Sequence, residues 1–224
     1  HMVSLVGPAT LRGREIGVPG DFSSAAFFIV AACLGAPDGL LIKNVGVNPT
    51  RTGLLTILRE MGADIELESE RRLGAEPVAD LFVRQSELRG IDVPPELVPL
   101  AIDEFPILFV AAAGARGTTR VSGAEELRTK ETDRLAVMAQ GLAAVGIAVE
   151  EQPGGLSVTG GRVRGGTVDS RGDHRIAMSF AIASLLAREP IDILNTAEVA
   201  TSFPTFLDVA TDVGLRIGPG AGNP

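Results

Sequence analysis

The residues of this sequence that are best suited to chemistry lie in "RTKETDRL", Arg128 to Leu135, where five of the first seven positions carry a charge. Only 21% of the whole chain is charged, so such a cluster is unusual here. A carboxylate set among ammonium and guanidinium groups can move a proton on a substrate whose anionic groups those cations hold. A simpler interpretation is the solvated first turn of a surface helix, with ion pairs at i,i+3 and i,i+4.

Helical geometry separates these charges if the helix begins near Lys130. At ~100° per residue, Glu131 falls at the centre of the apolar stripe that runs on to Val145, and Lys130 and Arg134 lie at its edge. Charges on the buried side of a helix have to be paired or to line a cleft, and cations in a first turn oppose the helix dipole unless an anion is near. The geometry therefore favours Lys130, Glu131 and Arg134 as site residues and turns Asp133 away from them.

A second charged helix start lies in "SRGDHRIAMSF", residues 170–180. Asp173 is a natural N-cap, and His174 and Arg175 follow it on the first turn of an apolar helix. The free N–H groups of a helix N-terminus attract anions, and an arginine placed there strengthens the attraction. The alternatives for Arg175 are extension to solvent or an ion pair with Asp173.

A third helix start, "AIDEFP", places Asp103 and Glu104 ahead of Pro106. A carboxylate that caps the helix would by itself account for this pattern. Asp103 becomes a site candidate because it begins the same kind of apolar helix as Arg175. If the helix starts converge, two carboxylates and three or four cations share one site. Such a set suits a reaction between anionic substrates in which a proton leaves one atom and is delivered to another.

The elements that must position these residues recur three times along the chain. Apolar runs of small residues occupy 23–36, 105–115 and 175–187. Each is followed by a β-rich piece, at 39–45, 117–123 and 190–196. An amphipathic stretch comes next and closes on a glycine and another strand; the glycines are Gly62, Gly146 and Gly214. A glycine directly after a helical pattern is the signal of a helix C-terminus.

The repeats predict an α/β (α+β) fold of the inside-out type. The first helix of each repeat is apolar nearly all round, which is typical of a helix buried on every side, and the second is one-sided. We therefore expect pseudo-threefold symmetry, with three helix–strand–helix–strand repeats around buried central helices. The expected domain spans 3–217, residues 1–2 are a tag remnant and 218–224 a flexible tail. The repeats cover about 16–80, 81–153 and 154–217, and further strand-like pieces lie at 80–85 and 155–160.

Composition limits the kinds of partner. A net charge of -8 argues against binding to nucleic acid or to a membrane surface, because both need a basic face. The one cysteine, Cys33, lies in an apolar run and is expected to be a buried structural thiol in a reducing compartment. The sequence has no apolar run of ~20 residues, no P-loop and no zinc-spaced Cys/His set, and we expect no signal peptide. We expect a cytoplasmic protein.

Together the motifs resemble the 5-enolpyruvylshikimate-3-phosphate synthase family. They are "VPGDFSSAAFF", "AIDEFP", "ELRTKETDRL", "GDHRIAMSFA" and "TSFPTF", which follow the family's order and cover nearly all of 3–217. The length is about half that of a full enzyme, so the chain resembles the C-terminal half, most of one of two similar domains. The resemblance implies carboxyvinyl transfer from phosphoenolpyruvate to the 5-hydroxyl of shikimate 3-phosphate. The reaction proceeds by addition and elimination through a tetrahedral ketal, without a metal or organic cofactor.

The resemblance also implies a role for each candidate. Asp103 would take the proton of the target hydroxyl, and Glu131 would exchange a proton at the methylene carbon of phosphoenolpyruvate. Lys130 would lie beside the reacting hydroxyl and both substrates. Arg134 and Arg175 would bind the phosphate and carboxylate of phosphoenolpyruvate.

His174 would flank that pocket in a secondary role. Many family members carry a lysine two residues before the "FP" of the last motif, where this chain has Thr201, so one expected cation is missing. The phosphate-binding segments of the other domain, a "GSKS"-like motif and "SSQ", are absent as well. The chain is therefore expected to have no turnover without the N-terminal half of the enzyme.

Three alternatives remain open at this point. UDP-N-acetylglucosamine enolpyruvyl transferase resembles the same fold and chemistry, but "KETDR" favours the shikimate enzyme, and the apolar setting of Cys33 does not suggest that family's reactive loop cysteine. A folding or interaction domain without catalytic function is the second alternative. An RNA 3′-phosphate cyclase-like protein is the third, and the acidic charge and the motifs argue against it.

Overall fold

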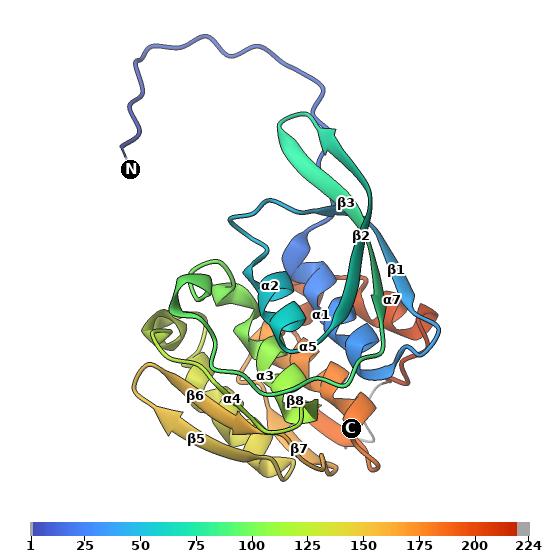
Figure 1. Ribbon diagram of the computed structural model, residues 1–224. Helices are drawn as coiled ribbons and strands as arrows, with labels where there is room; N and C mark the ends of the chain where they lie inside the picture. Colours follow the sequence, from blue (N-terminus) through green and yellow to red (C-terminus); the bar gives the residue numbers. More distant parts are fainter. Residues whose placement is uncertain (1, 219–224) are drawn as a thin grey trace.

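Three apolar helices form the centre of the molecule, and the sheets and remaining helices surround them (Figure 1). The computed structural model describes residues 2–218. The central helices are α1 (Phe22–Gly35), α3 (Phe105–Gly114) and α5 (His174–Ala183), and they pack against one another. Nearly every residue of α1 and α3 is buried, because their side chains are apolar on all sides. The predicted buried helices are confirmed, although the third run ends its α-helix at Ala183 and continues as a 3₁₀ turn, Ser184–Leu186.

The outer helices end as the glycine pattern predicts. They are α2 (Gly53–Glu60), α4 (Arg134–Ala144) and α7 (Phe206–Asp212), with a short α6 (Val199–Ser202) before the last. Gly62, Gly146 and Gly214 follow α2, α4 and α7 with φ of 98°, 85° and 94°. This left-handed conformation strains any residue with a Cβ, so each glycine allows the chain to leave its helix.

Two sheets share one topology. In the first, β1 (Leu40–Gly46), β3 (Glu76–Arg84) and β2 (Asp64–Leu73) are antiparallel in the order β1-β3-β2. In the second, β4 (Thr118–Arg120), β6 (Gly155–Thr159) and β5 (Ala148–Gln152) repeat that order. The pieces expected at 80–85 and 155–160 fall largely in β3 and β6, the central strands of the two sheets.

The third unit differs. Its strands β7 (Gly166–Asp169) and β8 (Ile191–Leu194) pair in parallel across α5. Within the described residues no strand follows Gly214, so the expected closing strand is wrong there. The N–H of Leu215 donates to the carbonyl of Ala210, as Ala63 does to Leu58 and Ile147 to Leu142, so α7 ends as the other outer helices do. The α/β class is confirmed, while the pseudo-threefold symmetry and the boundaries of the domain and its repeats stay predictions.

Two further expectations can be checked. Cys33 is fully buried in α1, and burial raises the pKa of its thiol to about 12, as befits a structural side chain. No helix within residues 2–218 has the length and apolarity that a membrane crossing needs. Residues 2–16 run away from the body as an extended segment (Figure 1), whereas Gly17 and Pro19 lie against Leu73 and Gly46 of the first sheet. His1 of the expected tag remnant and 219–224 of the expected tail lie outside the described residues.

Candidate functional site

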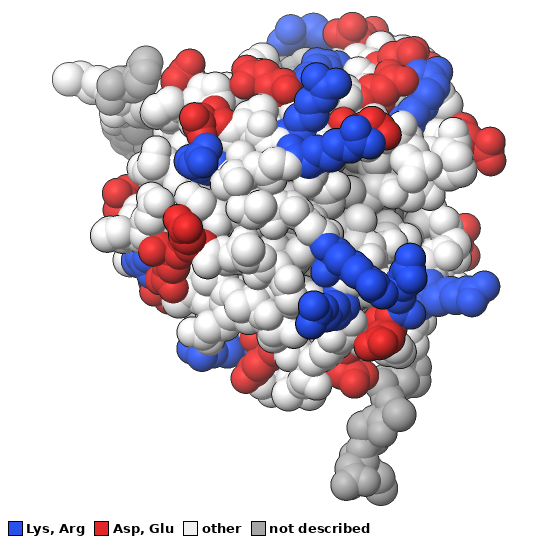
Figure 2. Space-filling model, turned by 60° about the horizontal axis from the view of Figure 1, so that its bottom comes forward, with Lys and Arg blue, Asp and Glu red and all other residues white. Residues whose placement is uncertain are grey.

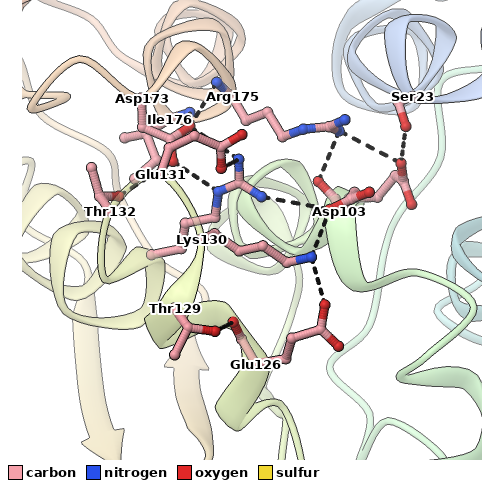
Figure 3. A network of polar contacts seen from close by, with 12 residues as sticks. Ser23, Asp103, Glu126, Thr129, Lys130, Glu131, Thr132, Asp173, Arg175 and Ile176 are labelled. Atoms are coloured by element: carbon pink, nitrogen blue, oxygen red, sulfur yellow. Dashed lines mark hydrogen bonds and ion pairs between the residues drawn. The ribbon is translucent and has the colours of Figure 1, made fainter.

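The helix starts that carry the predicted site residues meet in one polar network (Figure 3). Asp103 lies in the 3₁₀ turn η2 (Ile102–Glu104), directly ahead of α3. Lys130 follows a second 3₁₀ turn, η3 (Glu125–Thr129). Arg134 is the first residue of α4 and Arg175 the second of α5. The central and outer helices thus direct residues far apart in the sequence toward a common point.

Asp103 is the anion at the centre of this network. Its Oδ1 lies 3.4 Å from Nζ of Lys130 and 3.7 Å from Nη1 of Arg134. Partial burial raises the pKa of this carboxyl, but the charges of Arg175 and Lys130 outweigh burial and hold the pKa below its ordinary value. Helix α3 has no side-chain cap, so the alternative that this carboxylate merely caps the helix is wrong. Asp103 is therefore an ionised carboxylate whose role is not helix capping.

Lys130 is fixed between two carboxylates. Its Nζ lies 2.6 Å from Oε1 of Glu126, besides the contact with Asp103. The hydrogen bond with Glu126 raises the pKa of Lys130 more than burial lowers it, and the charge of Asp103 raises it further. The group therefore stays an ammonium ion that points at Asp103.

The helix expected from Lys130 onward begins later. Asp133 is the N-cap of α4 and accepts from the N–H of Ala136 at 3.0 Å, so Lys130 and Glu131 lie ahead of the helix. The helical geometry assumed from Lys130 onward is therefore wrong for the exposure of both residues. The side chain of Arg134 is buried, 1% exposed, and that of Glu131 is 51% exposed. Asp133 does point away from the network, because its carboxylate pairs with Arg128 at 2.8 Å.

Arg134 is the buried cation that ties the site together. Its Nε donates to Oδ2 of Asp173 at 2.8 Å, and its Nη2 lies 2.6 Å from Oε2 of Glu131. Its Nη1 is buried and has no hydrogen-bond partner within residues 2–218. A buried N–H without a partner is costly, so this nitrogen marks a place where an oxygen of a ligand could bind.

Asp173 is the N-cap of α5, as predicted. Its Oδ1 accepts from the backbone N–H groups of Arg175 and Ile176 at 2.9 and 3.4 Å, and Oδ2 accepts from Thr132 Oγ1 at 3.2 Å as well as from Arg134. Sequence reasoning recognised the cap but not the buried ion pair with Arg134. A contact across 39 residues leaves no local signal in a sequence.

The side chain of Arg175 is 17% exposed and lies between Glu104 and the backbone of Asp103, so it neither extends freely into solvent nor pairs with the Asp173 carboxylate. Its Nη1 donates to the backbone carbonyl of Asp103 at 3.0 Å. His174, half-buried at the start of α5, lies next to it. Burial lowers the pKa of His174 and the neighbouring Arg175 lowers it further, although Asp173 opposes the change. At neutral pH the imidazole is uncharged.

The structure adds three residues that the sequence analysis did not assign. Glu104 is buried beside Arg175, Ser23 of α1 donates to Glu104, and Arg51, ahead of α2, donates to Ser23. Two signals could have found them. Glu104 directly follows Asp103, and Arg51 precedes its outer helix just as the "KETD" residues precede α4.

The last motif contributes no contact to this network. Thr201 lies in α6, exposed, and its Oγ1 donates to the carbonyl of Glu198 at 2.7 Å. Basic side chains on the face drawn in Figure 2 gather in two groups separated by uncharged surface. No group of three or more His, Cys, Asp or Glu side chains within the described part of the chain could hold a metal ion.

The comparisons with known proteins agree with one another. The model of the family EPSP synthase (3-phosphoshikimate 1-carboxyvinyltransferase) matches residues 1–210. The chain is 56% identical over 217 residues to a 3-phosphoshikimate 1-carboxyvinyltransferase of Methylococcus capsulatus, covering 97% of this chain and 50% of that protein. It is 54% identical over 219 residues to one of Alkalilimnicola ehrlichii, covering 97% and 49%. The chain thus spans about half the length of the curated relatives it matches.

Solved structures give the same result. An EPSP synthase from Acinetobacter baumannii superposes with a TM-score of 0.91 at 49% identity, covering 96% of this chain and 50% of that one. The enolpyruvyl transferase NikO from Streptomyces tendae superposes with a TM-score of 0.63 at 20% identity, covering 87% and 43%, and shares the fold.

Proposed function

Because the chain belongs to the EPSP synthase family, we propose that it forms one wall of a carboxyvinyl-transfer site. The transfer runs from phosphoenolpyruvate to the 5-hydroxyl of shikimate 3-phosphate, and the other half of a full-length enzyme supplies the opposite wall. The observation that carries the proposal is the meeting of Asp103, Lys130 and Arg134, with one buried guanidinium nitrogen that has no hydrogen-bond partner among residues 2–218. The reaction needs no metal or organic cofactor from this chain.

Addition begins at the acceptor hydroxyl. Asp103 takes the proton of that hydroxyl while the oxygen bonds to C2 of phosphoenolpyruvate. The lowered pKa of Asp103 keeps the carboxyl ionised at neutral pH, the form in which it can accept a proton. Lys130, 3.4 Å from the same carboxylate, stabilises the negative charge that develops on the attacking oxygen.

A second carboxyl exchanges a proton with C3, the methylene carbon of phosphoenolpyruvate. Glu131 delivers a proton to C3, which gives the tetrahedral ketal with a methyl group. Elimination reverses this step: the methyl group returns a proton, phosphate leaves from C2, and the vinyl double bond forms again. Glu131 is half-exposed and touches Arg134, so it can face a substrate held by that arginine.

Phosphoenolpyruvate carries a phosphate and a carboxylate, and two guanidinium groups suit them. Arg134 offers Nη1, which forms no hydrogen bond within the described residues, and Arg175 contacts the backbone of Asp103. His174, uncharged at neutral pH, lies beside this pair in a secondary role. Thr201 supplies no cation of its own, so these arginines bear more of the anion binding than in relatives with a lysine there.

The experiment is to mix this chain with a separately produced N-terminal half from a close relative and to follow phosphate release and product. Activity should appear only in the mixture, and D103N and E131Q should each lower kcat by about 10²–10⁴-fold. Turnover by the chain alone would contradict the proposal. Replacing shikimate 3-phosphate by UDP-N-acetylglucosamine tests the alternative acceptor.

If the mixed halves form a complex that never regains activity, the interpretation as a non-catalytic domain is favoured. The same proposal assigns the protein to the cytoplasm, in keeping with a single, buried cysteine. Cell fractionation that recovers it from the periplasm or a membrane would contradict that location.

A further inference from the structure

We propose that Glu104 is a positioning residue for Arg175, and that Ser23 and Arg51 hold Glu104 in that role. The inference rests on the proposed function only for the use of Arg175 in binding phosphoenolpyruvate. It adds residues of the first repeat, where the sequence analysis names no site residue, to the support of the site.

Glu104 is a buried carboxylate at the start of α3. Its residue is 3% exposed, and Oε1 lies 3.7 Å from Nη1 of Arg175. It stands at the N-cap position of α3 but makes no side-chain cap bond, so its charge is not used by the helix. Burial disfavours the charged form of a carboxylate unless a cation and hydrogen bonds compensate it. Arg175 and Ser23 offset part of the effect of burial on Glu104, and the attraction to Glu104 restrains the guanidinium of Arg175 in return.

Two consecutive residues restrain the same guanidinium nitrogen. The backbone carbonyl of Asp103 accepts from Nη1 of Arg175 at 3.0 Å, and the carboxylate of Glu104 attracts it from the other side. Figure 3 shows this side chain extended from α5 across to η2. A free arginine side chain loses rotamer entropy when a ligand immobilises it. An arginine that is already restrained loses less rotamer entropy when substrate binds.

The first repeat completes the arrangement. The hydroxyl of Ser23, buried in α1, donates to Oε1 of Glu104. The same hydroxyl oxygen accepts from Nη2 of Arg51 at 3.2 Å. A hydroxyl that accepts from a cation becomes a stronger donor, so Arg51 strengthens the bond that orients Glu104. Arg51 also lies 3.9 Å from Oδ2 of Asp103, which draws it toward the site.

The first test uses the chain itself and does not depend on turnover. The Arg175 side-chain N–H signals are assigned in the NMR spectrum by their loss in R175K. In E104Q, whose side chain has the same size but no charge, guanidinium rotation and N–H exchange of Arg175 should quicken about fivefold. S23A should also quicken guanidinium rotation and N–H exchange of Arg175. It provides the test of the proposal if E104Q does not fold. Two matched controls, E87Q at an exposed pair with Arg116 and S24A beside Ser23, should leave the Arg175 signals unchanged.

The second test uses the reassembled enzyme, and the sign of the effect is informative. Removing a negative charge near Arg175 would by charge alone tighten anion binding and lower KM for phosphoenolpyruvate. Loss of positioning should instead raise that KM about fivefold, or ~1 kcal/mol, with kcat within about twofold. An unchanged or lower KM, or Arg175 signals unaffected in both variants, would overturn the inference. If the halves show no activity, the proposed function fails while the NMR result still decides the role of Glu104.

Discussion

Arg134 and Asp173 form a buried ion pair, with Nε of the guanidinium 2.8 Å from Oδ2 of the carboxylate and side chains 1% and 0% exposed. The pair joins the first residue of α4 to the N-cap of α5. The other two nitrogens of the same guanidinium face Asp103 and Glu131, at 3.7 and 2.6 Å. One arginine therefore sets the spacing of both proposed catalytic carboxyls, and one aspartate holds that arginine.

Replacing Asp173 by asparagine should destabilise the fold strongly. Asparagine caps a helix as well as aspartate does, so the change removes mainly the charge opposite Arg134. Breaking a buried pair costs about 3–5 kcal/mol, and we expect the lower end because Glu131 and Asp103 remain near the guanidinium. Urea unfolding measures the loss. The control D21N changes the exposed cap of α1 and should cost less than ~1 kcal/mol; equal losses would contradict a special role for the buried pair.

Adjacent carboxyls at η2 should affect stability in opposite ways as pH changes. The pKa of Asp103 is lowered, since Arg175 and Lys130 outweigh burial, so its contribution is present above its unfolded value near 3.8 and is lost as pH falls through the lower folded pKa. Burial raises the pKa of Glu104, against Ser23 and Arg175, so its contribution is present below about 4.5 and is lost as pH rises through the folded pKa.

The measurement is the free energy of unfolding between pH 3 and 7 for the wild type, D103N and E104Q. The stability gap between wild type and D103N should widen as pH rises. The gap between wild type and E104Q should narrow over the same change, or turn in favour of the variant. Parallel behaviour of the two gaps would show that the neighbouring carboxyls share one environment, contrary to their different burial.

The predictable parts of the fold are those that residues close together in the sequence determine. The buried helices follow from unbroken apolar runs, and the helix ends from Gly62, Gly146 and Gly214. The strand expected after Gly214 was wrong because a strand needs a partner, and hydrophobic pattern alone does not say whether one is at hand. The repeat pattern was extended to a third unit whose sheet differs.

The site was predictable as a set of residues but not in its geometry. The N-cap Asp133 was overlooked, so Glu131 was expected on a buried helix face and Arg134 at its edge, the reverse of what the structure has. Ser23 and Arg51 were missed because their contacts with Glu104 and each other span 28 or more residues. Such contacts depend on how the repeats pack against one another. The local pattern of apolar residues in the sequence does not determine that packing.

The two neighbouring charges Lys130 and Asp133 should differ sharply in function. In the reassembled enzyme, K130M removes the ammonium beside Asp103 and should lower kcat by about 10²–10³-fold, as when one donor to a developing oxyanion is lost. D133S keeps a good helix cap and removes only the contact with Arg128, which retains Glu151 at 2.9 Å. Its kcat and KM should stay within about twofold of wild type. Comparable damage from both changes would mean that the whole charge run acts together.

His174 should report directly on anion binding. Burial and the adjacent Arg175 lower its pKa below 6.5, so the imidazole is neutral at pH 7. An anion bound between Arg134 and Arg175 would offset their positive charge and stabilise the protonated ring, so phosphoenolpyruvate should raise this pKa. The chain has two histidines, and H1A leaves one imidazole signal to follow by NMR during a pH titration. In R175A the free chain should show a higher pKa for His174 and a smaller response to phosphoenolpyruvate. A ligand-induced fall in pKa, or a response equal to wild type in R175A, would separate His174 from the proposed anion site.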